Sequence, residues 1–335
     1  MRLFVTGGAG FMGSNFIRYV LTKYPEYEVV NFDKLTYAGN LENLRDMEHD
    51  KRYTFVKGDI ADAKAVQQAM DKHRPDAILN YAAETHVDRS ILDPDAFVRT
   101  EVIGTYTLLE AAKTFKNRRF VQISTDEVYG HVASGRTSET AMLAPRSPYS
   151  ASKAGADLLV QAYHTTFGVP TILTRSCNFL GPYQFPEKFI PFFITNLIDG
   201  KSLPVYGDGK QSREYIYVDD HCAAIDLLLH EGTAGEIYNI SSEKSQENLT
   251  VVKLLLKMFG KDESVVEHVA DRPGHDRRYA PDAAKLRREL HWKPTVAFEE
   301  GLRRTVEWYR EHEGWWRPLK SGVHLKYFQQ QYGDR

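Results

Sequence analysis

The sequence predicts an α/β fold in which a doubly wound parallel sheet is followed by a smaller C-terminal α+β lobe. Three observations lead to this prediction. Short apolar runs alternate with amphipathic segments in the first half, a glycine-rich turn follows the first run, and prolines gather in the second half. With 335 residues, the chain is long enough for two lobes.

The elements of the first half are predicted from apolar runs and from helical spacing. The predicted strands are Arg2–Thr6, Glu28–Phe32, Thr54–Val56, Ala77–Ala82, Phe120–Ser124 and Thr171–Arg175. The predicted helices are Phe11–Leu21, Asp62–His73, Ala96–Phe115 and Ser150–Phe167. Strands that alternate with helices favour a parallel sheet with helices on both faces.

The second half has a different character. Prolines recur between positions 182 and 204, and short mixed segments follow one another. We therefore predict a first domain at residues 1–178 and a smaller lobe mainly at residues 179–335. Segment 234–240 contains a predicted strand, Glu236–Ile240, that could return to the main sheet.

The composition excludes several classes of protein. Lys plus Arg total 43 against 45 Asp plus Glu, so a net charge of −2 offers no basic excess for nucleic acid. No apolar run approaches the roughly 18 residues that span a bilayer, and the pattern of a secretory signal is missing. Two cysteines are too few for a disulfide framework or a structural zinc site. We expect a cytoplasmic protein that binds no metal and no membrane.

The turn after the first strand is expected to bind a dinucleotide. Residues 6–13, TGGAGFMG, fit G-x-x-G-x-x-G through Gly7, Gly10 and Gly13, and G-x-G-x-x-G through Gly8. Glycines let the backbone approach a pyrophosphate, and the following helix directs free N–H groups at it. Asp33 follows Gly13 by about 20 residues, so its carboxylate would bind ribose hydroxyls and repel a 2′-phosphate. The pattern indicates a Rossmann-type domain that binds NAD rather than NADP.

Tyr149 and Lys153 are a candidate catalytic pair. They form Tyr-x-x-x-Lys at the start of a predicted helix, and a spacing of four places both on one face. A free tyrosine has a pKa of about 10, which a nearby ammonium lowers. The pair is a candidate general base for a sugar hydroxyl. The alternative is a surface tyrosine beside a solvated lysine.

Asp126 and Glu127 follow the strand Phe120–Ser124, at the sheet edge where α/β proteins bind ligands. Burial and mutual repulsion can hold two adjacent carboxyl groups in different protonation states, as a dehydration requires. The alternative is a solvated acidic turn or a helix cap. Asp59, after the third strand, also has two interpretations, as a contact for adenine or as a helix cap.

Seven motifs carry a resemblance to a known family. They are TGGAGFMG, DKLTYAGN, AAETHVDRS, STDEVYG, SPYSASK, GPYQFPEK and DRPGHDRRYA. Together they resemble the dTDP-glucose 4,6-dehydratases of the extended short-chain dehydrogenase/reductase family, from Arg2 to about Tyr309. DKLTYAGN, STDEVYG and RPGHDRRYA separate this group from sister epimerases and decarboxylases, which share the glycine turn and the Tyr-x-x-x-Lys pair.

The resemblance implies a hydro-lyase of deoxysugar biosynthesis that uses NAD and makes dTDP-4-keto-6-deoxy-glucose. Tyr149 would deprotonate the sugar 4-hydroxyl while hydride passes from C4 to NAD+. Thr125 would bond to the 4-oxygen, and Lys153 would also hold the nicotinamide ribose. Glu127 would then remove the C5 proton, Asp126 would protonate the departing 6-hydroxyl, and the hydride would return to C6.

The resemblance also implies residues for the two ligands. Cofactor contacts are expected from Gly7, Gly10, Phe11, Met12, Gly13, Asp33, Lys34, Thr36, Asp59, Ile60, Ala82, Ala83, Tyr149 and Lys153. Contacts with the nucleotide sugar are expected from His86, Asn178, Glu187, Lys188, Pro204, Tyr206, Arg213, Asn248, Arg272 and His275. Guanidinium groups suit phosphate oxygens, although an arginine could equally form a surface ion pair. Tyr206 could instead belong to a small core, and the two histidines could be structural.

Three places depart from the family pattern. Glu101 stands where the family usually has an asparagine that supports the catalytic region, so its carboxylate needs a new partner. Phe179-Leu180 replaces Asn-Tyr, which removes a polar group near the sugar. Ser241-Ser242 replaces Gly-Gly, and serine resists the positive φ that glycine allows. These departures leave the nucleotide and sugar specificity open.

Other functions also remain open from the sequence. The nearest is a 4,6-dehydratase for UDP-glucose or another nucleotide sugar. An extended-family epimerase or decarboxylase has no need of both carboxyl groups, and a non-catalytic protein that binds NAD or a nucleotide sugar has no need of the Tyr-Lys pair. The apolar faces of Ala96–Phe115 and Ser150–Phe167 match helices that join two subunits in the family, so a homodimer is expected.

Overall fold

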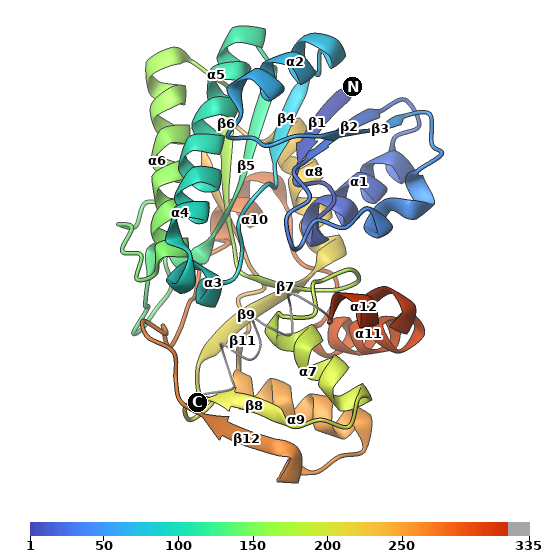
Figure 1. Cartoon of the computed structure of the whole chain (residues 1–335). Helices are drawn as coiled ribbons and strands as arrows, with labels where there is room; N and C mark the ends of the chain where they lie inside the picture. The colour runs from blue at the N-terminus through green and yellow to red at the C-terminus, as the bar shows by residue number, and fades with distance from the viewer. Residues whose placement is uncertain (321–335) are drawn as a thin grey trace.

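The expected parallel sheet is confirmed in the computed structural model, which describes residues 1–320 (Figure 1). Seven strands lie in the order β10-β6-β5-β4-β1-β2-β3, and every neighbouring pair is parallel. They are β1 (Arg2–Thr6), β2 (Glu28–Asp33), β3 (Tyr53–Lys57), β4 (Ala77–Asn80), β5 (Arg119–Thr125), β6 (Thr171–Ser176) and β10 (Ile237–Ile240). The order reverses between β1 and β4, the kind of position at which α/β sheets bind ligands.

Helices cover both faces of this sheet. On one face α1 (Phe11–Lys23) packs against α8 (Val218–Glu231), and on the other lie α2 (Ala63–His73), α5 (Thr105–Phe115) and α6 (Pro148–Phe167). Successive residues of β1 enter opposite cores, since Leu3 and Val5 join one apolar cluster and Phe4 joins the other. A sheet buried on both faces explains why its strands are continuous apolar runs in the sequence.

The predicted helix Ala96–Phe115 is confirmed as helical throughout, but it is not a uniform α-helix. This stretch consists of α4 (Pro94–Phe97), a π-helical turn η2 (Val98–Gly104) and α5. The other predicted elements of the first half end within about two residues of the observed ones. A π turn holds more residues than an α turn, which 3.6-residue periodicity cannot reveal. In this turn Glu101 is fully buried.

The second half forms two small sheets with their helices (Figure 1). One sheet has the order β11-β9-β7, and the other pairs β12 with β8. These strands are β7 (Asn178–Leu180), β8 (Leu203–Tyr206), β9 (Ser212–Tyr217), β11 (Ser245–Glu247) and β12 (Val266–Val269). The remaining helices and turns are η1 (Leu41–Met47), α3 (Val87–Leu92), η3 (Asp126–Tyr129), α7 (Phe189–Ile198), α9 (Asn248–Phe259), η4 (Glu263–Val265), α10 (Ala284–Leu290), α11 (Phe298–Glu311) and α12 (Glu313–Leu319).

The chain passes between the two halves more than once. α8 and β10 come after residue 178 in the sequence, yet α8 packs on α1 and β10 pairs with β6. The domain boundary at residue 178 therefore stays a prediction, and the last part of the predicted lobe, residues 321–335, lies outside the described residues.

Residues 1–320 contain no helix long and apolar enough to cross a membrane. Within the same residues, no three His, Cys, Asp or Glu side chains gather as a metal site would require. Cys177 and Cys222 are both free and buried. Burial raises the pKa of each thiol well above its usual value, which disfavours the thiolate that a nucleophile needs.

A buried ion pair joins the sheet to its helices beneath the site. Arg175 on β6 is 2% exposed, and its Nε donates to Oδ2 of Asp157 on α6 at 2.8 Å. Arg175 Nη1 also donates to Tyr129 Oη at 3.1 Å, and Tyr129 donates to Asn239 on β10 at 2.8 Å. These bonds tie β6, α6, η3 and β10 together.

We predict that Asp157→Ala destabilises the protein by about 3–5 kcal/mol, because it leaves the Arg175 guanidinium buried without its counter-charge. The measurement is thermal unfolding followed by circular dichroism. Asp95→Ala is the control, since it removes an exposed pair with Arg99 and should change stability by less than about 1 kcal/mol. Equal losses in the two variants would contradict the prediction.

Candidate active site

One large cavity opens at the carboxyl ends of the central strands and extends between the two halves of the chain. It encloses about 410 Å³. Every catalytic, cofactor and substrate residue that the sequence analysis named lies along its wall. Residues far apart in the sequence are thus brought together, from Gly7 in the first turn to His275 near the C-terminal end. The role of each residue stays a prediction.

The glycine turn between β1 and α1 forms a narrow backbone cradle at one end of the cavity. Gly7 has φ +63, and a Cβ there would lie 2.6 Å from the Ala82 backbone. A Cβ on Gly13 would lie 2.5 Å from the carbonyl oxygen of Gly7. Gly10 precedes α1 without a side-chain cap, so the first N–H groups of the helix face this end. The cradle suits a pyrophosphate, which needs close approach and free N–H donors.

Asp33 stands beside this cradle at the end of β2. Its Oδ2 accepts from the Ala9 N–H at 2.9 Å and its Oδ1 from the Leu35 N–H at 2.7 Å. Burial raises the pKa of Asp33, and these two hydrogen bonds act in the opposite direction. A carboxylate has about four lone-pair sites, so two bonds leave capacity for ribose hydroxyls.

Asp59 is part of the same wall and is not a helix cap. Its Oδ2 lies 2.7 Å from Lys34 Nζ, and its Oδ1 accepts from the Ala61 N–H at 2.9 Å. The cap of α2 is Asp62, whose side chain accepts from the N–H groups of Lys64 and Ala65. The pair Lys34–Asp59 therefore presents a hydrogen-bonding edge to the cavity.

The two carboxyl groups after β5 have different environments. Asp126 and Glu127 begin the turn η3, with Thr125 as its cap. Asp126 is 3% exposed, and burial together with the charge of Glu127 raises its pKa well above the usual value, with Arg213 acting in the opposite direction. Glu127 is half-buried, and Tyr279 Oη lies 3.4 Å from its Oε2. Asp126 is therefore suited to hold a proton, whereas the half-buried Glu127 is accessible from the cavity.

Tyr149 and Lys153 lie on one face of α6, as the spacing predicts. The helix starts at Pro148 behind a Ser147 cap, so both residues fall in its first turns. Burial, then the charges of Glu127 and Glu101, raise the Tyr149 pKa well above 10, while a hydrogen bond with Thr125 acts in the opposite direction. The expected lowering of this pKa is thus wrong for the protein by itself.

The Lys153 ammonium is tied to the protein. Its Nζ donates to the Ile123 carbonyl at 3.3 Å and lies 2.8 Å from Glu101 Oε2. Glu101, the departure from the family asparagine, therefore has a partner, and that partner is Lys153. Burial raises the pKa of Glu101, and the charge of Lys153 acts in the opposite direction.

Asp88 is a central residue that the sequence analysis missed. It is buried on α3, and its Oδ2 lies 3.4 Å from Tyr206 Oη and 3.5 Å from His86 Nδ1. Arg272 Nη1 lies 3.7 Å from its Oδ1. One carboxylate thus orients three of the predicted substrate residues. Its signal in the sequence was its place in AAETHVDRS, two residues after His86.

The other predicted substrate residues make distinct contacts. Arg213 donates to the carbonyls of Asp276 and Ser212, each at 2.9 Å, rather than to a surface carboxylate. Glu187 is bound by Arg89 at 2.7 Å, and this ion pair occupies its Oε2. Lys188 Nζ donates to Thr85 Oγ1 at 2.7 Å, and burial lowers its pKa.

The pKa values of His275 and His86 are both lowered, which favours neutral rings near pH 7. His275 lies 2.6 Å from Asp271 Oδ1, and burial, aided by Arg272, lowers its pKa to about 4. Burial and nearby cations, Lys188 first among them, lower the His86 pKa well below its usual value. Near neutral pH, each ring therefore has one nitrogen that donates a hydrogen bond and one that accepts a hydrogen bond.

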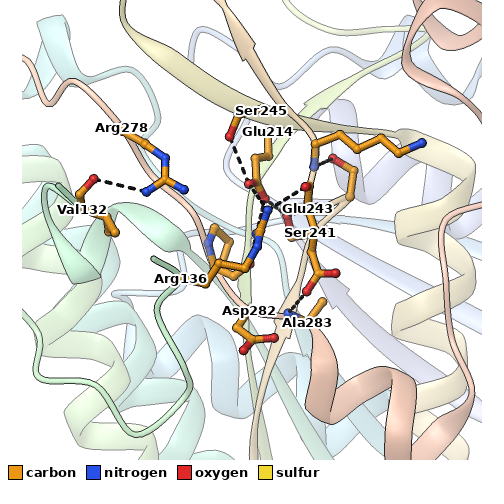
Figure 2. Close-up of polar contacts among 12 residues, drawn as sticks. Val132, Arg136, Glu214, Ser241, Glu243, Ser245, Arg278, Asp282 and Ala283 are labelled. Carbon is orange, nitrogen blue, oxygen red and sulfur yellow. Dashed lines mark hydrogen bonds and ion pairs between the residues drawn. The ribbon is translucent and has the colours of Figure 1, made fainter. Parts of the chain in front are cut away.

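The serines that replace glycines are accommodated without a left-handed backbone (Figure 2). The residue with positive φ in this loop is Glu243, at +56, rather than Ser241 or Ser242. Ser241 Oγ donates to one carboxylate oxygen of Glu214, whose other oxygen lies 2.9 Å from Arg136. Neither serine therefore needs the positive φ that glycine allows, and Ser241 has a buried acceptor.

The apolar departure after β6 packs into the protein. Leu180 is buried in the core. Phe179 lies against the ring of His221, with ring centroids 4.7 Å apart in an edge arrangement, and it also lines the cavity. Burial lowers the His221 pKa to about 3, which is consistent with an apolar neighbour.

Comparisons with known proteins agree on one family. A family model described as GDP-mannose 4,6 dehydratase matches residues 4–305. The dTDP-glucose 4,6-dehydratase of Shigella flexneri is 48% identical over 361 residues, covering 100% of each chain. The structure of a Streptomyces venezuelae dTDP-glucose 4,6-dehydratase with NAD bound has a TM-score of 0.93 and 52% identity, covering 96% of this chain and 100% of that one. A UDP-glucose 4-epimerase of Thermotoga maritima is less similar, at 30% identity and a TM-score of 0.87 over 93% of this chain and 99% of that one.

We predict that Gly7→Ala weakens NADH binding by about tenfold or more, equivalent to roughly 1.4 kcal/mol. The added Cβ would meet the Ala82 backbone at 2.6 Å and close the cradle. The measurement is fluorescence titration with NADH. Gly135→Ala is the matched control, because Gly135 has a similar φ of +70 but open space around it. If both variants bind NADH like the parent, the cradle is not the dinucleotide site.

Proposed function

Because this chain belongs to the dTDP-glucose 4,6-dehydratases, we propose that its cavity converts dTDP-glucose to dTDP-4-keto-6-deoxy-glucose with the residues assigned from the sequence. The enzyme is an NAD-dependent hydro-lyase, EC 4.2.1.46. The observation that supports the assignment most strongly is the pair Asp126 and Glu127 on the same cavity wall as Tyr149, where burial raises the pKa of Asp126 and so favours its protonated form.

The residues at the glycine cradle fit NAD. Gly7 and Gly13 leave room that a Cβ would fill, and Asp33 has free acceptor capacity for the adenosine ribose. Lys34, Thr36, Asp59, Ile60, Ala82 and Ala83 complete the wall, with Phe11 and Met12 at the start of α1. When bound, NAD+ supplies the hydride acceptor for C4 and returns the hydride to C6. Its positive ring would also favour the Tyr149 phenolate that the protein by itself disfavours.

Tyr149 acts first, as the base for the sugar 4-hydroxyl. Thr125, already hydrogen-bonded to Tyr149, holds the 4-oxygen in line with the phenol. Lys153, fixed at the Ile123 carbonyl, supplies the nearby positive charge and a donor for the nicotinamide ribose. Oxidation at C4 then makes the C5 proton acidic.

Glu127 and Asp126 carry out the elimination. Glu127 removes the C5 proton, and Asp126 gives its proton to the departing 6-hydroxyl, which leaves as water. Burial supports this division of roles, because it raises the pKa of the deeper carboxyl group and so favours its protonated form. An epimerase or decarboxylase needs no such pair, and a purely binding protein needs neither pair nor base.

The second half of the chain holds the nucleotide and diphosphate. Guanidinium groups of Arg213 and Arg272 offer planar donors for phosphate oxygens, and Lys188 adds a charge. Tyr206 and Pro204 provide a surface for the base, with Asn178, Glu187, Asn248, His275 and His86 as further contacts. Asp88 orients this set, so it belongs with the positioning residues.

The test of the reaction is mass spectrometry of the products in D₂O, with dTDP-glucose and UDP-glucose in separate tubes and no NAD added. The parent should remove one water from the dTDP sugar and take up deuterium at C5. Glu127→Gln should lower both rates by about 10²–10⁴-fold, since it removes the C5 base. Asp126→Asn should lose water slowly but still exchange C5. The control is Glu299→Gln, at an exposed site on α11.

The outcomes separate the alternatives. Water loss from UDP-glucose alone would keep the mechanism and move the nucleotide assignment. Full turnover by Glu127→Gln would contradict the role of Glu127. Loss of water from neither sugar, even with added NAD, would contradict the proposed reaction.

A homodimer in the cytoplasm is the assembly and location that we propose. Apolar side chains stand exposed in one area formed by η2, α5 and α6, where α5 and α6 pack side by side. They include Ile103, Tyr106, Leu158 and Phe167, at 46–59% exposure. An apolar area of this kind on adjacent helices favours a two-fold pair of subunits.

We predict that Leu158→Arg converts the protein from dimer to monomer, because a charge would be buried in the subunit contact. Light scattering after size-exclusion chromatography measures the mass. Met142→Arg is the control, since Met142 is 88% exposed and lies in the loop before α6, outside η2, α5 and α6. A parent that already runs as a monomer would refute the dimer.

A further inference from the structure

Glu101 is the buried carboxylate that contacts the catalytic lysine. Its Oε2 lies 2.8 Å from Lys153 Nζ, and the two side chains are 0% and 5% exposed. Glu101 does not line the cavity, whereas Lys153 does. Any effect of Glu101 on the reaction must therefore pass through Lys153 or through its charge.

The π turn η2 fixes Glu101 in this place. η2 packs directly on α6, the helix that carries Tyr149 and Lys153. The approach is close, since a Cβ on Gly155 of α6 would lie 3.2 Å from Val102 of η2. The carboxylate consequently faces the ammonium across a tight helix contact, with no room for it to turn to solvent.

We propose that Glu101 is a positioning residue that holds the Lys153 ammonium and offsets its charge at Tyr149, and so sets the pH at which Tyr149 works as a base. The proposal rests on the proposed function, which assigns Tyr149 as that base. Glu101 thereby connects a departure from the family pattern to the pH dependence of the reaction.

The charges around Tyr149 decide the direction of the effect. Glu127, Glu101 and Asp126 oppose the phenolate, whereas a hydrogen bond with Thr125 favours it. A positive charge near the phenol, such as that of Lys153, acts in the same direction as Thr125 on general grounds. Because Glu101 adds negative charge near the phenol, its removal should lower the Tyr149 pKa.

Two further acids lie near this group, the half-buried Glu84 and the buried Asp157. Glu84, in the loop after β4, has a pKa raised to about 7 by burial and then by Glu101. Asp157, on α6, is paired with Arg175. Removal of Glu101 would also make Glu84 easier to ionise. The ionised Glu84 would restore part of the lost negative charge. We therefore expect the Tyr149 pKa to fall by one unit at most.

The experiment compares the parent with Glu101→Gln and Glu101→Asn across pH. The rate of NADH formation is followed after NAD-loaded enzyme is mixed with dTDP-glucose, together with steady-state kcat and KM. In both amide variants, the acidic limb of the pH–rate profile should move to lower pH by up to about one unit. KM should change little, since Glu101 does not touch the substrate cavity. Glu101→Asp keeps the charge, so its limb should stay near that of the parent.

Asp95→Asn is the matched control, because it removes one negative charge at an exposed site on the neighbouring helix α4 and should leave the limb in place. An unchanged limb in both amide variants, with only lower thermal stability, would overturn the proposal and assign Glu101 to the fold. Failure of both variants to fold would do the same. A parent that is inactive on dTDP-glucose at every pH would instead count against the proposed function.

Discussion

Exclusion of water at the carboxyl end of β5 is the constraint on which the site depends. An unpaired charge is costly in such surroundings, so each ionisable group must be paired or neutral. Lys153 is paired with Glu101, and Arg175 with Asp157. Asp126 faces the charge of Glu127 in the same buried place, and its pKa rises accordingly. The same burial that disfavours unpaired charge thus favours the protonated form of Asp126.

Local sequence was sufficient for the sheet but not for every helix. Strands buried on both faces are apolar runs, and Arg2–Thr6 was predicted with its observed bounds. The helix over Ala96–Phe115 was predicted, but its π turn was not, because the apolar spacing continues through it. The partner of Glu101 lies about 50 residues further along the chain, so no local pattern records why the turn is there.

In the candidate site, too, local sequence was sufficient for some residues and not for others. Gly7, Gly13 and Asp33 were recognisable because the strand, turn and helix around them are contiguous in sequence. Asp88 was missed because its role consists of contacts with Tyr206 and Arg272, which come from distant segments. The direction of the Tyr149 pKa was also wrong from sequence, since a lysine four residues away was visible but the burial and the opposing carboxylates were not.

The two adjacent carboxyl groups illustrate how one short turn can supply an acid and a base. η3 directs Asp126 inward and leaves Glu127 half-buried, so neighbours in the chain have different surroundings. The groups that complete those surroundings come from the second half: Arg213 on β9 acts on Asp126, and Tyr279 reaches Glu127. The surroundings of the two acids therefore depend on contact between the halves. The same contact is secured by the path of the chain, which returns to the main sheet through α8 and β10 after it has built part of the cavity wall.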